Sequence, residues 1–158
     1  MNYKTIKKYD IANAIGIHTS IFFTGCKFHC HNCFNKEIWD FNSGEYFDKQ
    51  AKDKLYEYIS DEHVKGLSIL GGEPLQQGEE LLNLLKEIKI KFPNKRIWLW
   101  TGYYLNELND LQKEIISYCD RVIDGRFDNN LKNYNLKLRG SSNQSIYDNI
   151  NGEFVKIE

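Results

Sequence analysis

The sequence lacks any long apolar run, and its charges nearly cancel. No stretch approaches the roughly 18 consecutive apolar residues of a membrane-spanning helix, so we expect no membrane partner. The 158 residues include 21 basic and 22 acidic side chains, which gives a formal net charge of −1. Nucleic acid is therefore disfavoured as a partner, because binding to phosphates requires an excess of clustered Lys and Arg.

Proline and cysteine are also scarce. Only two prolines occur, Pro74 after a Gly-Gly pair and Pro93 at the end of a helical stretch. The first 16 residues lack the apolar core and the small-residue cleavage site of a signal peptide, so we expect a cytoplasmic protein with reduced thiols. Four cysteines in such a compartment do not indicate a disulfide scaffold. Any cluster of them instead predicts a metal or redox site.

Apolar runs and helical periodicities alternate along the chain, whose length fits a single domain over residues 1–158. Alternation of this kind predicts right-handed crossovers and an α/β fold with a mostly parallel sheet. A closed eight-unit barrel needs about 250 residues, so we expect a partial, open (βα) barrel with a curved sheet. The expected strands are 17–25, 66–72, 96–102 and 120–125, the expected helices are 47–60 with Asp48 as N-cap, 78–93 and 105–119, and 136–148 is an appended strand or loop.

Each expected strand ends in an unusual loop. The four sequences are TGCKFHCHNC, GGEP, TGYY and DGRF. Because the carboxyl ends of parallel strands form the ligand-binding edge of such sheets, we expect these four loops to share one site.

Three of the four cysteines, Cys26, Cys30 and Cys33, lie in the first loop with the spacing C-x3-C-x2-C. Structural zinc requires four ligands, usually two separated pairs, and only His29 and His31 inside the loop offer a fourth. A [4Fe-4S] cluster held by three thiolates keeps one iron open for a small molecule. The spacing alone leaves both metals possible, and we expect the remaining Cys119 to be a buried apolar side chain.

The C-x3-C-x2-C loop after the first strand and GGEP (71–74) after the next together resemble the radical S-adenosylmethionine enzymes. This resemblance implies a [4Fe-4S] cluster on Cys26, Cys30 and Cys33, whose open iron binds the amino and carboxylate groups of S-adenosylmethionine. It also implies that backbone of the glycine-containing loop contacts the methionine amino group, with Glu73 stabilising that loop. The residues that it places at S-adenosylmethionine are Asn32, Cys33, Phe34, Gly71, Gly72, Glu73 and Thr101.

Further blocks narrow the resemblance. GCKFHCHNCFNKEIWDF, LSILGGEPL, IWLWTGY, VIDGRF and RGSSNQSIYD follow one another within residues 10–150 and are similar to the activating components of anaerobic ribonucleoside-triphosphate reductases. The chain departs from that pattern in two places. Ala14 and His18 replace a glycine and an arginine before the first strand, and Asn32 stands where many relatives in the wider superfamily have an aromatic residue.

The resemblance implies reductive cleavage of S-adenosylmethionine to methionine and a 5′-deoxyadenosyl radical. That radical abstracts hydrogen from a glycine Cα of the reductase large subunit and leaves a glycyl radical there. The implied electron donor is a protein such as reduced flavodoxin. No side chain of this chain is expected to act as a general acid or base, since the cofactor carries the chemistry.

Other polar and aromatic residues carry weaker expectations. Asp124 and Arg126 are expected to pair with each other or to meet the substrate. We expect the tryptophans to be core residues and Phe28 and Phe34 to shield the cluster or contact the partner. The residues expected to hold an anionic group or the partner's glycine loop are Arg139, Ser141, Ser142 and Asn143.

Two competing hypotheses remain at this stage. One is a radical S-adenosylmethionine enzyme that acts on a small molecule, similar to a short carboxy-deazaguanine synthase. It requires a dedicated polar pocket, and the DGRF and RGSSNQ blocks argue against it. The other is a zinc-binding adaptor without catalysis, which metal analysis would distinguish.

Overall fold

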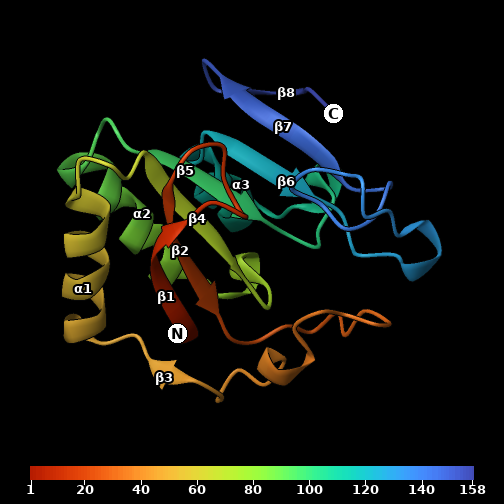
Figure 1. The fold of residues 1–158 in the computed structure, drawn as a ribbon, viewed down its shortest axis with the longest axis horizontal. Helices are drawn as coiled ribbons and strands as arrows, with labels where there is room; N and C mark the ends of the chain where they lie inside the picture. The colour runs from red at the N-terminus through yellow and green to blue at the C-terminus, as the bar shows by residue number, and fades with distance from the viewer.

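The computed structural model describes residues 1–158 and shows three helices and one eight-stranded sheet (Figure 1). Four short 3-10 turns lie in the connections. The strands are β1 (Asn2–Asp10), β2 (His18–Phe23), β3 (Glu45–Tyr46), β4 (Gly66–Gly71), β5 (Arg96–Trp100), β6 (Arg121–Asp124), β7 (Ser145–Ile150) and β8 (Glu153–Lys156). The helices are α1 (Lys49–Ser60), α2 (Glu79–Lys91) and α3 (Asp110–Ser117), and the 3-10 turns are η1 (Lys36–Ile38), η2 (Pro74–Gln76), η3 (Leu105–Glu107) and η4 (Asn129–Leu131).

The sheet has the strand order β3-β1-β2-β4-β5-β6-β7-β8 and is not closed. Its four central strands, β2, β4, β5 and β6, pair in parallel. The strands on both sides pair antiparallel. The prediction of an α/β fold with an open sheet is therefore confirmed, but the sheet is mixed and parallel only in its centre. Barrel-like curvature stays a prediction.

Three strands were not predicted, and each lacks an apolar run. In β1 the sequence NYKTIKKYD buries only every third or fourth residue, and Lys4 and Lys7 are exposed. The strand β3 has two exposed residues, and β8 is an exposed edge strand. The strands β1 and β3 form where neighbouring strands offer backbone partners, which local composition does not show, whereas β8 follows the Asn151–Gly152 turn that is typical of a hairpin.

The three helices pack on one face of the sheet. Alternate residues of β2, β4 and β5, which include Ile21, Leu67 and Leu99, belong to the same buried cluster as side chains of all three helices. Asp48 caps α1 as predicted, because its side chain accepts a hydrogen bond from the Ala51 N–H. None of these helices is long and apolar enough to cross a membrane.

The helix predicted over 105–119 is shorter than expected. Its first part is the 3-10 turn η3, and Leu108 then adopts an extended conformation. Asn109 starts α3 in a capping box with Gln112, whose side chain accepts a hydrogen bond from the Asn109 N–H. This N-terminal cap favours a new helix that begins at Asp110 over one continuous helix from residue 105.

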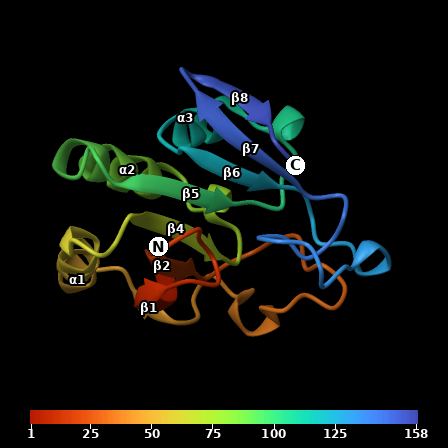
Figure 2. The same ribbon diagram turned by 45° about the horizontal axis from the view of Figure 1, so that its top comes forward.

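The four parallel strands point in one direction. In Figure 2 their arrowheads face the side of the molecule where the loop after β2 and the segment between β6 and β7 lie. The fold therefore brings the four strand-end loops to one edge, as the parallel arrangement predicts.

Candidate functional site

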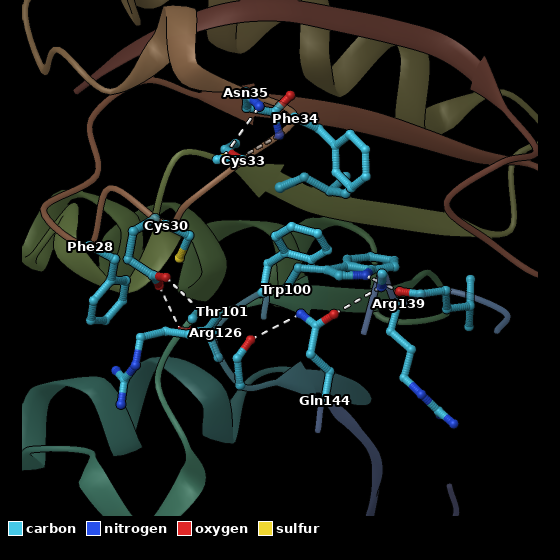
Figure 3. Close-up of a pocket in the computed structure, with 18 of the residues that line it drawn as sticks. Phe28, Cys30, Cys33, Phe34, Asn35, Trp100, Thr101, Arg126, Arg139 and Gln144 are labelled. Carbon is cyan, nitrogen blue, oxygen red and sulfur yellow. Dashed lines mark hydrogen bonds between the residues drawn. The ribbon is translucent and has the colours of Figure 1, made fainter. Parts of the chain in front are cut away.

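A cavity of about 460 Å³ lies at this edge, within the range of small-molecule sites (Figure 3). It is lined by all four strand-end loops and by the segment 132–144. The predicted site residues among its lining are Cys26, Cys30, Cys33, Phe34, Gly71, Gly72, Glu73 and Thr101. Asn32 is exposed and lies outside the lining.

The cysteine loop is held at its base by backbone hydrogen bonds. The Gly25 and Cys26 N–H groups donate to the carbonyls of Ile38 and Trp39 at the end of the same loop. Gly25 has φ +100°, and a Cβ there would lie 2.1 Å from the ring of Phe41. Only glycine therefore fits at the entry to the loop.

The three loop cysteines are free and half-buried, and all three line the cavity. Burial raises the pKa of the Cys26 and Cys30 thiols above the ordinary value. These thiols are therefore neutral in the apoprotein at neutral pH, and binding of a metal releases their protons. The Asn35 N–H donates to the Cys33 Sγ at 3.4 Å, which orients that sulfur.

The GGEP loop crosses directly over the base of the cysteine loop. The Gly72 N–H donates to the Phe23 carbonyl, and the Glu73 N–H donates to the Gly25 carbonyl at 2.8 Å. A Cβ on Gly72 would lie 2.3 Å from the same Gly25 oxygen, and one on Gly71 would lie 2.1 Å from the Phe23 oxygen. The glycine pair is thus required by the close approach of two backbones.

Glu73 joins the GGEP loop to the loop after β5. Its side chain is 1 % exposed and accepts hydrogen bonds from the Leu75 N–H, the Thr101 hydroxyl and the Gly102 N–H. Burial raises the pKa of Glu73 to about 7, although these hydrogen bonds oppose the shift. The expectation that Glu73 stabilises the loop agrees with these contacts, which also reach the neighbouring loop.

Aromatic contacts complete this side of the cavity. The Phe28 ring packs edge-on against Tyr103 at 4.7 Å between centroids, and the Arg126 guanidinium lies 4.9 Å from the Phe28 centroid. Arg126 forms a two-point ion pair with Glu107, with the shorter contact at 2.7 Å. The expected pairing of Arg126 with Asp124 does not occur, because the Asp124 carboxylate accepts from the Leu105 N–H instead.

The RGSSNQ block supports the DGRF loop from behind. Gln144 donates to the Gly125 carbonyl and accepts from the Gly140 N–H, and Asn143 donates to the Arg126 carbonyl. Arg139 lines the cavity and pairs with Glu158 at 3.2 Å. Ser141, Ser142 and Asn143 do not line this cavity. The main contacts of the RGSSNQ block are therefore hydrogen bonds to the backbone of the DGRF loop, and few of its side chains face the cavity.

The tryptophans divide between core and site. Trp98 is fully buried, as predicted, but Trp100 lines the cavity and donates its indole N–H to the Leu138 carbonyl at 2.6 Å. Sequence reasoning also missed Asn35, which lines the cavity beside Cys33. Its place two residues after the third cysteine was the only available signal. Cys119 is 1 % exposed, as predicted for a core side chain.

The donor set distinguishes between the two metals. No three or more His, Cys, Asp or Glu side chains lie close enough to hold a single ion. His29 stacks on Trp39 at 4.2 Å between centroids, and His31 is exposed. The thiolates of a cubane cluster bind separate irons, so three cysteines that line one cavity without a fourth ligand fit a cluster better than a four-ligand zinc ion.

Comparison with known proteins agrees with this geometry. The family described as "4Fe-4S single cluster domain" matches residues 12–147, which defines the chain as an iron–sulfur protein. Over 154 residues the chain is 38 % identical to the anaerobic ribonucleoside-triphosphate reductase-activating protein of Enterobacteria phage T4, covering 96 % of this chain and 97 % of that protein.

Cellular relatives of the same name are equally similar. Identity is 38 % to the protein of Escherichia coli (strain K12) and 36 % to that of Vibrio cholerae serotype O1, each over 151 residues and 93 % of this chain. The alignments cover 98 % and 97 % of those relatives. The chain belongs to the family of anaerobic ribonucleoside-triphosphate reductase-activating proteins.

Proposed function

We propose that this chain is a radical S-adenosylmethionine enzyme that activates an anaerobic ribonucleoside-triphosphate reductase. When bound, the [4Fe-4S] cluster supplies one electron for cleavage of S-adenosylmethionine to methionine and a 5′-deoxyadenosyl radical. The radical takes hydrogen from a glycine Cα of the reductase large subunit, which leaves a glycyl radical. The single observation that carries this proposal is the meeting of the C-x3-C-x2-C and GGEP loops at one cavity.

In this proposal Cys26, Cys30 and Cys33 hold the cluster and leave one iron open. All three line the cavity, and the remaining Cys119 is buried in the helix-covered core. A cluster with one open iron can bind the amino and carboxylate groups of S-adenosylmethionine as a chelate.

The chain's own part is to bind S-adenosylmethionine, to orient it and to exclude water. The GGEP backbone at Gly71 and Gly72 faces the cavity and would contact the methionine amino group. Glu73 fixes that backbone, Thr101 lies just after the neighbouring strand β5, and Phe34 would present an aromatic surface for the adenine. Asn32 lies outside the lining, so we leave it out of this set.

The reductase supplies the glycine, so its chain must reach an open cavity. Phe34 and Tyr134, at the mouth, are 65 % and 81 % exposed, which suits contact with a protein surface. We also propose that residues 1–158 act as one domain in the cytoplasm, with a reduced electron carrier such as flavodoxin as donor and with neither nucleic acid nor membrane as partner.

Anaerobic reconstitution tests the proposal directly. We expect a brown protein with about four irons and four sulfides per chain. With a reductant, S-adenosylmethionine and the reductase large subunit, it should produce a glycyl-radical doublet in the electron paramagnetic resonance spectrum. A colourless protein with one zinc per chain, or a cluster-loaded protein that yields no doublet, would contradict the proposal.

Single substitutions identify the ligands. Cys26→Ala, Cys30→Ala and Cys33→Ala should each abolish S-adenosylmethionine cleavage, which is measured as 5′-deoxyadenosine formed. Cys119→Ala is the matched control, because this thiol lies in the core and should leave cleavage intact. If the Cys119 variant alone lost the cluster, the three-ligand assignment would be wrong.

A further inference from the structure

We infer that Asn35 is a positioning residue that fixes the GGEP loop against the third cysteine and thereby sets the affinity for S-adenosylmethionine. The inference rests on the proposed function and adds to it a residue outside both the cysteine and the GGEP motifs. Asn35 follows Cys33 by two positions and lies in the cavity wall between Cys33 and Gly71.

Asn35 makes one hydrogen bond within the cysteine loop and one to the GGEP loop. Its backbone N–H donates to the Cys33 Sγ at 3.4 Å, and its side-chain Nδ2 donates to the Gly71 carbonyl at 3.1 Å. Gly71 is 36 positions away in the sequence. One residue therefore contacts both a proposed cluster ligand and the first residue of the loop that would hold the methionine amino group.

The rest of Asn35 is held by local structure. Its carbonyl accepts from the Ile38 N–H at 3.1 Å, which makes Asn35 the residue before the 3-10 turn η1. The side chain therefore reaches Gly71 from a backbone that is itself hydrogen-bonded to η1. Asparagine suits the place because its amide is short and carries the N–H donor that a carbonyl acceptor requires.

The hydrogen bond acts on a backbone that has little freedom of its own. Gly71 has φ +144°, and the next residue, Gly72, touches the backbone of the cysteine loop. On its other side the GGEP loop is fixed by Glu73. Asn35 supplies the contact on the side of the cluster, so its loss would remove the hydrogen bond that holds the Gly71 carbonyl next to Cys33.

Reconstituted holoprotein provides the test, with S-adenosylmethionine as the titrated ligand. Asn35→Asp keeps the shape and the backbone N–H but replaces the donor to Gly71 with a carboxylate oxygen. Asn35→Ala removes the donor without adding charge. Both variants should retain the wild-type iron and sulfide content and should bind S-adenosylmethionine about tenfold more weakly, the effect of one lost partly buried hydrogen bond.

Electron paramagnetic resonance of the reduced cluster supplies a readout that a general loss of stability would not move. We expect an unchanged spectrum without ligand, and a ligand-induced change that saturates only at about tenfold higher S-adenosylmethionine concentration. Asn42→Asp is the control. Asn42 is exposed on the same loop, and its replacement by Asp adds the same negative charge as Asn35→Asp. It should behave as wild type.

Unchanged affinity for S-adenosylmethionine in both Asn35 variants would overturn the inference. Weaker binding in Asn35→Asp alone would also overturn it, because the added negative charge and not the lost hydrogen bond would then be the cause. Iron loss in parallel with affinity would also overturn it, because Asn35 would then only help to retain the cluster. Wild-type holoprotein that fails to bind S-adenosylmethionine would instead refute the proposed function, so the two failures are distinguishable.

Discussion

Glu73 shows how one buried carboxylate couples two parts of the site. Its oxygens face three donors from the backbone and from Thr101, yet burial still dominates and raises its pKa to about 7. At neutral pH the folded protein therefore holds this group near its midpoint. Protonation there would remove an acceptor from Thr101 or Gly102, so Glu73 links the geometry of both loops to pH.

We expect Glu73→Gln to change how stability depends on pH. The folded-state pKa of about 7 exceeds the ordinary value of 4.5, so the folded chain keeps a proton that the unfolded chain releases. The free energy of unfolding of the wild type therefore decreases as pH rises between these two values, and glutamine removes that contribution. In urea titrations the variant should lose more stability, relative to wild type, at about pH 5 than at about pH 8.

His18 has the opposite effect on the pH dependence of stability, and its contribution must be distinguished from that of Glu73. Burial lowers its pKa to about 4, so its contribution to stability is complete above the ordinary value of 6.5 and is lost as pH falls towards 4. Because His18 is present in both proteins, the difference between wild type and Glu73→Gln cancels its effect. An equal difference at both pH values would contradict the raised pKa of Glu73.

At the scale of elements, the crossing of the GGEP loop over the cysteine loop decides which glycines are essential. Gly72 needs no unusual dihedral angle, but it has no room for a Cβ because of the Gly25 carbonyl. Gly152, in the turn between β7 and β8, has φ +91° and open space around it. A substitution at Gly72 therefore tests steric contact alone, and one at Gly152 tests backbone strain alone.

Gly72→Ala should lower the free energy of unfolding by about 2–3 kcal/mol, because two rigid backbones must move apart. Gly152→Ala should cost only about 1 kcal/mol, the strain of a left-handed alanine. Chemical denaturation of both variants measures the two costs. A larger loss for Gly152→Ala would mean that the two loops separate easily.

The same scale shows what composition reveals about the fold. The central strands and the helices α1 and α2 were predicted close to their observed bounds, because each carries its own apolar pattern, whereas α3 begins five residues later than expected. The strand β1 was missed because only Tyr3, Ile6 and Asp10 are buried in it, which gives no alternating pattern, although its partner β2 is the next strand along the chain. The strand β8, in contrast, pairs with β7 across the two-residue turn Asn151–Gly152, a local hairpin signal that was overlooked.

At the scale of the whole molecule, the location of the site could be predicted from the sequence. The hydrogen bonds and ion pairs that join its loops could not. Parallel strands placed all four loops at one edge. The Asn35–Gly71 and Glu73–Gly102 hydrogen bonds join residues 36 and 29 positions apart. The spacing of residues within a motif therefore does not predict them. The Arg126–Glu107 pair replaced the expected partner because η3 brings Glu107 to the guanidinium.

The mouth of the cavity should determine how well the reductase is recognised. Tyr134 is 81 % exposed at the mouth, and Ile90 is 84 % exposed on α2, away from the cavity lining. If the reductase covers the mouth, Tyr134→Ser should raise the reductase concentration for half-maximal activation by about tenfold, as loss of a large interface residue does. Glycyl-radical yield at increasing reductase concentration measures it.

Ile90→Ser is the matched control for this experiment. It removes an equally exposed apolar side chain from the helical face and should leave the activation curve unchanged. Equal effects of both substitutions would place the reductase elsewhere or indicate a general change in solubility.

The base of the cysteine loop has a consequence for how the protein matures. Its hydrogen bonds, from Gly25 to Ile38, from Cys26 to Trp39 and from Glu73 to Gly25, are all between protein backbone groups. None of them involves iron, so we expect the chain to complete its sheet and present its thiols before any metal arrives. We therefore expect delivery of a preassembled cluster by a carrier to proceed on an already folded acceptor, with iron supply and synthesis of the chain separable in time.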